Sequence, residues 1–96
     1  MIVTEHINMN RLVVAVCDDS LLNTKIQDST TILDLTSRFY NGQKKTPEEF
    51  IGLLKKTYML NAVGEDIIEL LIQHKITDKK AVKYVNGVPY IIIIFN

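Results

Sequence analysis

Several features that mark secreted, membrane and nucleotide-binding proteins are scarce in this chain. Cys17 is the only cysteine, which excludes an internal disulfide and a Cys-x-x-Cys zinc site and is typical of a reducing, cytoplasmic protein. The four glycines are too scattered for a dinucleotide or Walker phosphate loop. The longest apolar run, 91–95, is far shorter than the ~20 residues that cross a bilayer, and the N-terminus does not resemble a signal peptide. We therefore expect neither a membrane protein nor export by that route.

An excess of charge is absent as well. Eleven Lys and Arg residues balance eleven Asp and Glu residues, so no global field attracts nucleic acid or a membrane surface. The composition, 47% hydrophobic and 23% charged, is that of a globular protein. The length predicts a single domain, residues 1–96, that buries its own core.

Four β-favouring runs form two predicted hairpins. The first turns at Asn-Met-Asn and the second at Asn-Gly, a pair that favours a type I′ turn. Pro89 lacks an N–H, so strand pairing there should begin after it or lie at an edge. The four runs cover residues 2–7, 11–17, 81–85 and 88–95.

The segment between the first hairpin and the first helix carries weaker signals. Residues 18–20 offer capping side chains ahead of two leucines, which predicts a short helical turn before Asn23. Residues 30–35 indicate a third strand. Residues 39–42 end in Asn-Gly, which indicates a tight turn.

Two helices are predicted in the second half of the chain. Thr46-Pro47-Glu48-Glu49 has the sequence of a capping box with proline at the first helical position. An apolar stripe follows at three- and four-residue spacing. A break at 61–64 precedes a second helix from Glu65 to about His74, and we expect the two helices to form a corner or hairpin. The stripe of the first helix consists of Phe50, Leu53, Leu54 and Tyr58.

These elements predict an α+β fold: a small, mostly antiparallel sheet of about four to five strands, two main helices on one face, and one short helical turn. The run 91–95 does not alternate, so both faces of that strand require burial. The helices cover only one face. The second face requires either the first hairpin folded across it or a second copy of the chain, giving a homodimer through the C-terminal strand.

Cys17 and Asp18 are weak candidates for catalysis. Cys17 ends a strand, where an exposed thiol could use His6 or His74 as a base, but strand-end cysteines are commonly buried, and no basic neighbour in the sequence lowers its pKa. Asp18 and Asp19 could bind a hard cation, but helix capping is the commoner use of such a pair. No metal or cofactor is expected, and an enzyme is less expected than a non-catalytic protein.

Basic residues form two groups along the chain. If both groups lie on one face they form a phosphate-binding surface, whereas the alternative is that they only solubilise helix ends. Phe39 and Tyr40 beside the first group could stack on bases. The first group is Arg38, Lys44, Lys45, Lys55 and Lys56, and the second is Lys75, Lys79, Lys80 and Lys83.

Five short motifs follow one another along the chain: Val14-Ala15-Val16-Cys17-Asp18, Leu21-Leu22, Phe39-Tyr40-x-Gly42, Asn61-Ala62-Val63-Gly64-Glu65 and Gly87-Val88-Pro89. Their order and spacing resemble an archaeal family catalogued as domain of unknown function 424. The resemblance runs from about Leu12 to Tyr90 and implies a small cytoplasmic archaeal protein with no established activity and at most a suspected link to translation or RNA. Asn23 stands where the family favours glycine, and Tyr90 where it favours histidine. A phenol with a pKa of ~10 cannot replace an imidazole in catalysis near neutral pH. The motif positions include Cys17, Asp18, Phe39, Tyr40, Gly42, Asn61, Gly64, Gly87 and Pro89.

Three functions follow from these observations. The first is an RNA- or ribosome-associated protein that uses the basic groups and binds less tightly as salt rises. The second is a protein-interaction or homodimerisation module that uses the apolar C-terminal strand. The third is an enzyme that uses Cys17 and Asp18, which requires a thiol that is reactive at neutral pH.

Overall fold

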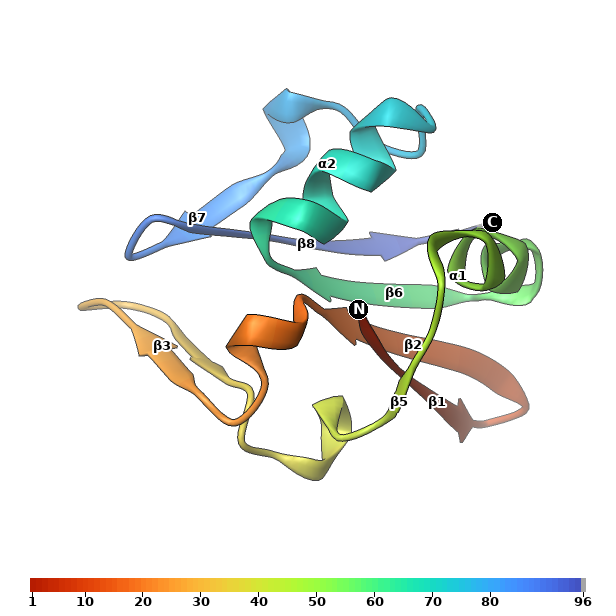
Figure 1. Cartoon of the computed structure of the whole chain (residues 1–96), viewed down its shortest axis with the longest axis horizontal. Helices are drawn as coiled ribbons and strands as arrows, with labels where there is room; N and C mark the ends of the chain where they lie inside the picture. The colour runs from red at the N-terminus through yellow and green to blue at the C-terminus, as the bar shows by residue number, and fades with distance from the viewer. Residues whose placement is uncertain (96) are drawn as a thin grey trace.

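The computed structural model describes residues 1–95, within which eight strands, two α-helices and four 3-10 turns are formed (Figure 1). In chain order these are β1 (Ile2–Asn8), β2 (Arg11–Cys17), η1 (Asp19–Leu21), β3 (Lys25–Gln27), β4 (Ile32–Asp34), η2 (Arg38–Tyr40), β5 (Gln43–Lys44), α1 (Pro47–Leu53), η3 (Leu54–Lys56), β6 (Met59–Val63), α2 (Glu65–Gln73), η4 (Lys79–Ala81), β7 (Lys83–Val85) and β8 (Val88–Ile94).

Six of the strands form one sheet in the order β5-β1-β2-β6-β8-β7. Every neighbouring pair is antiparallel except β2 and β6, which run parallel. Strands β3 and β4 form a separate two-stranded sheet. The predicted α+β class with two helices is confirmed, but the expected four to five strands were too few.

Both predicted hairpins are present, and their turns have the backbone that the sequence favours. Met9 and Asn10 have φ angles of 53° and 65°, and Asn86 and Gly87 have 48° and 81°. Two consecutive positive φ angles are the signature of a type I′ turn, which matches the twist of the flanking strands. The β6–β8 ladder begins directly after Pro89, as expected for a residue without an N–H.

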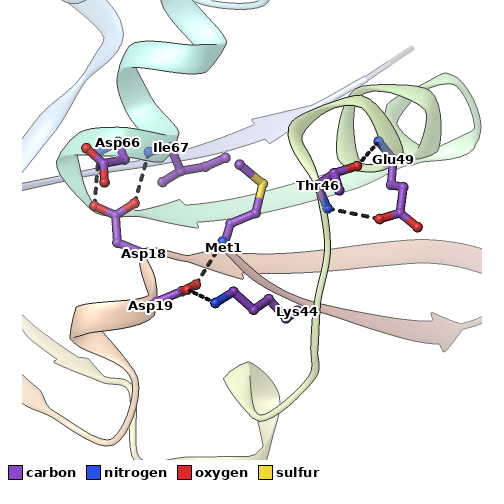
Figure 2. A network of polar contacts seen from close by, with 8 residues as sticks. All are labelled: Met1, Asp18, Asp19, Lys44, Thr46, Glu49, Asp66 and Ile67. Atoms are coloured by element: carbon purple, nitrogen blue, oxygen red, sulfur yellow. Dashed lines mark hydrogen bonds and ion pairs between the residues drawn. The ribbon is translucent and has the colours of Figure 1, made fainter.

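Helix α1 begins with the predicted capping box (Figure 2). Thr46 Oγ1 accepts from the Glu49 N–H at 3.1 Å, and Glu49 Oε1 accepts from the Thr46 N–H at 2.9 Å. The helix ends earlier than its apolar stripe indicated, at Leu53, and the Thr57 hydroxyl donates to the Leu53 carbonyl at 2.9 Å. Tyr58 therefore lies outside the helix, and its place in the predicted stripe was wrong.

The predicted break at 61–64 was wrong, because most of it belongs to β6, a central strand of the sheet. The two helices are consequently separated by a strand and do not form the expected corner or hairpin. Strand β6 pairs with β2, whose Val13 lies opposite Met59. Pairing with a parallel strand so distant in the sequence leaves no local sign of a strand at residues 59–63. Asn61 and Gly64, by contrast, are residues that favour a turn, which is why a break was predicted.

Helices α1 and α2 cover the same face of the sheet, as predicted (Figure 1). Because side chains alternate along a strand, every second residue of the central strands points to the helices. This helix-covered face contains most of the buried core. Its buried side chains include Val14, Val16, Phe50, Leu53, Leu60, Ala62, Ile67, Ile68, Leu71 and Ile91.

The second face of the sheet is covered over one end only. The first hairpin does not fold across it, as had been one expectation, because both of its strands are part of the sheet. Residues 18–42, with the β3–β4 hairpin, cover this end instead and bury Leu35 against Cys17 and Val63. The predicted third strand, 30–35, is reduced to β4, which pairs with β3 and not with the main sheet. Within residues 1–95, no helix is long and apolar enough to span a membrane.

Candidate functional site

The Cys17 thiol lies in a buried cluster at the covered end of the sheet. Its side chain is 0% exposed and packs with Leu35 and Val63. Burial, with a smaller contribution from the charges of Asp18 and Asp19, raises the pKa of this thiol to about 11. A thiol in that state is protonated and screened at neutral pH, so the geometry does not supply an attacking thiolate.

Neither histidine lies beside this thiol. Cys17 is opposite Ile2 in the β1–β2 ladder, and His6 is four residues further along β1, about 13 Å away at the usual rise of a strand. His6 Nε2 is instead 3.0 Å from the carbonyl oxygen of Phe39. His74 follows the C-terminal end of α2, whereas the Cys17 strand ends near the N-terminal end of that helix. The predicted catalytic candidates therefore do not converge.

The Asp18 carboxylate caps α2 across a long stretch of sequence (Figure 2). It accepts from the Asp66 N–H at 3.0 Å and from the Ile67 N–H at 2.9 Å. It makes no such bond to the adjacent turn η1, so the predicted cap exists but serves a different helix. A carboxylate at this end also compensates the helix dipole.

Asp19 makes ion pairs at the neighbouring strand ends. One carboxylate oxygen lies 2.8 Å from the amino group of Met1 and the other 3.1 Å from Lys44 Nζ (Figure 2). Hydrogen bonds from these two groups hold the pKa of the Asp19 carboxyl below its usual range. Within residues 1–95, no three His, Cys, Asp or Glu side chains converge as a metal site requires.

Gly64 allows Asp18 to reach α2. Gly64 has a φ of 124°, and a Cβ placed on it would lie 2.3 Å from the Asp18 carboxyl carbon. Its N–H donates to the Pro89 carbonyl at 2.9 Å, which ties the start of β8 to the same point. The expected tight turn is present at Gly42, whose N–H donates to the Tyr40 carbonyl at 3.0 Å. The glycine itself is required by a close backbone approach, because a Cβ on it would lie 2.1 Å from the Val3 carbonyl oxygen. These motif positions therefore maintain the fold.

Two other motif residues, Phe39 and Asn61, line a hollow of about 580 Å³ on the second face of the sheet. The Phe39 ring stacks on His6 with centroids 4.7 Å apart, and the Arg11 guanidinium lies 4.2 Å from the centroid of the Tyr58 ring. Tyr40, by contrast, packs edge-on against Phe39 and into the buried Cys17 cluster. The hollow is lined by Asn8, Met9, Arg11, Val13, Phe39, Tyr58, Met59 and Asn61.

The hollow adjoins an apolar part of the sheet that no other segment within residues 1–95 covers. Ile94 pairs with Met59, which in turn pairs with Val13, so the three side chains form a row across β8, β6 and β2. Ile92 and Ile94 remain 59% and 52% exposed. We name this surface, formed by Val13, Met59, Asn61, Ile92 and Ile94, the open half-face.

Strand β8 also has an unpaired edge beside the open half-face. Strand β7 pairs with residues 88–90 only, so the described part of the chain provides no neighbour for Ile91–Ile94 on that side (Figure 1). The Pro89 carbonyl and the Phe95 N–H face β6. Because this direction alternates along a strand, Ile92 and Ile94 direct their N–H and C=O groups away from β6. We name residues 91–94 the open β8 edge.

The predicted basic residues are interspersed with carboxylates. Lys44 pairs with Asp19, and Lys45 and Lys56 surround a second hollow together with Glu5 and Glu49. Arg38 lies in η2 beside Phe39, and Lys55 lies in η3 beside Lys56. Lys79 and Lys80 are in η4, whose N-cap is Asp78.

Arg11, Tyr58, Met59 and the open β8 edge were not predicted as parts of a site from the sequence. A signal existed for Arg11, which directly follows the predicted turn at residues 8–10. Tyr58 and Met59 were assigned to the end of a helix, so their position on the sheet was not accessible without recognising β6.

The fold and this site define a small α+β protein in which one half of a sheet face is open to solvent. The chain belongs to the family of proteins of unknown function DUF424, which matches residues 6–95 and confirms the resemblance seen in the motifs. Its fold is similar to the crystal structure of an uncharacterized conserved protein from Methanopyrus kandleri, with a TM-score of 0.79 and 19% identity over 96% of this chain and 88% of that one. No curated protein matches the chain.

Proposed function

We propose that this protein is a non-catalytic protein-interaction module. Its partner supplies an extended, apolar segment that adds a strand to the open β8 edge and packs against the open half-face. One observation carries this proposal. Ile92 and Ile94 lie on an unpaired strand edge, and their side chains are also about half exposed.

The chemistry of the edge favours an extended peptide. Only an extended backbone satisfies N–H and C=O groups that alternate along a strand, and the side chains beside them then select the residues that fit. Charged side chains are absent from residues 88–95, so ion pairs from this strand do not contribute to binding. Apolar surface that is exposed at a sheet edge is a common mark of a protein-binding site.

The test is binding of peptides selected from a display library on the wild-type protein. Ile92→Lys should weaken the selected peptides, whereas Ile32→Lys, a change at an equally exposed isoleucine in the separate β3–β4 sheet, should not. Peptides methylated on the amides that face the edge should also lose affinity, because they cannot pair with the strand. Equal binding to both variants would sink the proposal.

A second candidate is RNA binding in the hollow, which one observation favours. Among the lining residues within 1–95, Arg11 is the only charged one, and it is accompanied by two aromatic rings and the amides of Asn8 and Asn61. Aromatic and guanidinium planes stack on unpaired bases, and a cation without neighbouring carboxylates attracts phosphate.

Co-sedimentation with ribosomal subunits and with single-stranded RNA at two salt concentrations tests this candidate. RNA binding should weaken as salt rises and on Arg11→Gln, while the variant Lys55→Glu/Lys56→Glu reports whether the basic groups take part. Absence of binding at low salt excludes the candidate and leaves the protein-interaction module.

A further inference from the structure

We infer that the strand which docks on the open β8 edge is β8 of a second copy of this chain, antiparallel to the first about a two-fold axis. This inference rests on the proposed protein-interaction function and names its partner. The two six-stranded sheets then join into one continuous sheet.

The charge of the edge supports a second copy as the occupant. Natural sheet edges usually carry a lysine, a proline or a bulge that prevents pairing with other strands. Pro89 and the charged Lys83 both lie in the part where β7 already pairs with β8, and neither protects residues 91–94. An edge without charge matches an uncharged apolar strand, and β8 itself is such a strand, so two copies meet without like-charge repulsion.

The alternation of the backbone fixes the register of this pairing. Within residues 91–94 only Ile92 and Ile94 direct their backbone groups outwards, and the antiparallel register in which both of them are paired places Ile92 of one copy opposite Ile94 of the other. Each such pair exchanges two N–H···O bonds, and the arrangement is the same when the copies are interchanged. That identity is the condition for a closed two-fold dimer.

The side chains follow the same symmetry. Ile92 of each copy meets Ile94 of the other on the second face of the sheet, beside Met59, with which Ile94 pairs. Two isoleucines and a short edge bury less than the ~800 Å² per partner of a standard interface. We therefore expect a dimer that dissociates on dilution.

Equilibrium sedimentation of the full chain over a hundredfold range of concentration tests the inference. The wild-type mass should rise from 11.0 kDa towards twice that value as concentration rises. Ile92→Lys should remain monomeric, because it sets a charge in the apolar seam. Ile32→Lys, on the exposed β3–β4 hairpin, should dimerise like the wild type.

A charge-pair variant tests the register itself. Ile92→Lys combined with Ile94→Glu places an ammonium opposite a carboxylate in both pairs, so dimerisation should return. Ile92→Lys combined with Ile94→Lys should stay monomeric. Circular dichroism shows whether each double variant is folded. If the variant with Ile92→Lys and Ile94→Glu is folded but does not dimerise, the register is contradicted.

The outcomes separate this inference from the proposed function. A wild-type protein that stays at 11.0 kDa over the whole range overturns the second copy as occupant. If that monomer still binds selected peptides through Ile92, the protein-interaction function stands with another partner. If neither dimer nor peptide binding is found, both proposals fail.

Discussion

The two halves of the sheet's second face differ in what covers them. At one end, residues 18–42 fold back and bury Cys17, Leu35 and Val63 completely or almost completely. At the other, Ile92 and Ile94 remain more than half exposed beside an unpaired strand edge. The side chains of both halves are largely apolar, so hydrophobicity alone does not explain the difference. The difference is whether the chain supplies its own cover.

The covered half shows how an irregular segment can complete a core. Leu35 follows β4, and its backbone is held from both sides: its carbonyl accepts from the Asn23 N–H at 3.0 Å and its N–H donates to the Thr24 carbonyl at 2.8 Å. Asn23 has a φ of 68°, a conformation that asparagine tolerates well. The open half has no equivalent segment within residues 1–95, which is why we assign it to a partner.

The largest expected effect comes from removing the residue that covers the buried half. Leu35→Ala should lower the free energy of unfolding by about 2–5 kcal/mol, because it leaves a cavity beside Cys17 and Val63. Ile92→Ala on the open half should cost less than about 1 kcal/mol in the monomer. Urea denaturation at low protein concentration measures both. Equal losses would contradict the division of this face into covered and open halves.

A slightly smaller loss is expected at the junction that anchors the covered half. Asp18→Ala should lower the free energy of unfolding by about 2–3 kcal/mol, because two N–H groups of α2 lose their acceptor in a buried position. Asp18→Asn retains one acceptor oxygen and should lose less. Asp19→Ala, whose carboxylate makes no bond to α2, serves as the control and should leave that helix intact. Denaturation monitored by circular dichroism ranks the three variants.

Thiol reactivity distinguishes the two halves without a change in stability. Burial raises the pKa of Cys17 to about 11, so its thiolate fraction at neutral pH is roughly a hundredfold or more below that of a free cysteine. In an Ile92→Cys variant, iodoacetamide should modify the new thiol rapidly and Cys17 only on unfolding. Mass spectrometry of the digested protein resolves the two sites. Equally rapid modification of Cys17 in the folded protein would show that the covered half is open.

The smallest effect is expected from a region outside the comparison, the capping box of α1. Hydrogen bonds from Thr46 lower the pKa of the Glu49 carboxyl below its usual value of 4.5. A lowered folded-state pKa means that the stabilisation is complete above about pH 4.5 and is lost as the pH falls through the folded-state pKa. Glu49→Gln should remove this part of the acid dependence and with it the small stabilisation at neutral pH, so that variant and wild type converge in stability as the pH falls. A denaturant series from pH 6 to pH 3 measures the slope.

The sequence correctly predicted those parts of the fold that depend on interactions between residues close together in the chain. The turns at Met9-Asn10 and Asn86-Gly87 require positive φ angles, which asparagine and glycine favour. In the capping box, Thr46 and Glu49 accept hydrogen bonds from each other's backbone N–H groups at the start of α1. Strand β6 was missed because its partner β2 is distant in the chain, and Leu35 looked like part of an ordinary strand. Strand pairing and packing between distant segments leave no periodic pattern in the local sequence, so they could not be predicted from it.

The candidate site was predicted less completely than the fold. The apolar run 91–95 predicted that the first hairpin or a second copy covers the second face of the last strand; the hairpin does not cover it, and cover by a second copy stays a prediction. The run gave no sign that β7 would begin only at Lys83 and pair with residues 88–90 alone, which leaves an edge unpaired. Asp18 was expected to cap the helical turn that directly follows it, but its carboxylate instead caps α2, which begins 47 residues later. Arg11 and Tyr58 come together only because β2 and β6 are neighbours in the sheet.

Amide hydrogen exchange at Ile91–Ile94, followed by NMR, tests the open β8 edge most directly. In dilute protein the amides of Ile92 and Ile94 should exchange rapidly and those of Ile91 and Ile93, which face β6, slowly. At high concentration Ile92 and Ile94 should become protected as the second copy docks. Slow exchange of all four amides in dilute protein would contradict an open edge, and unchanged rapid exchange at high concentration would contradict pairing of two copies.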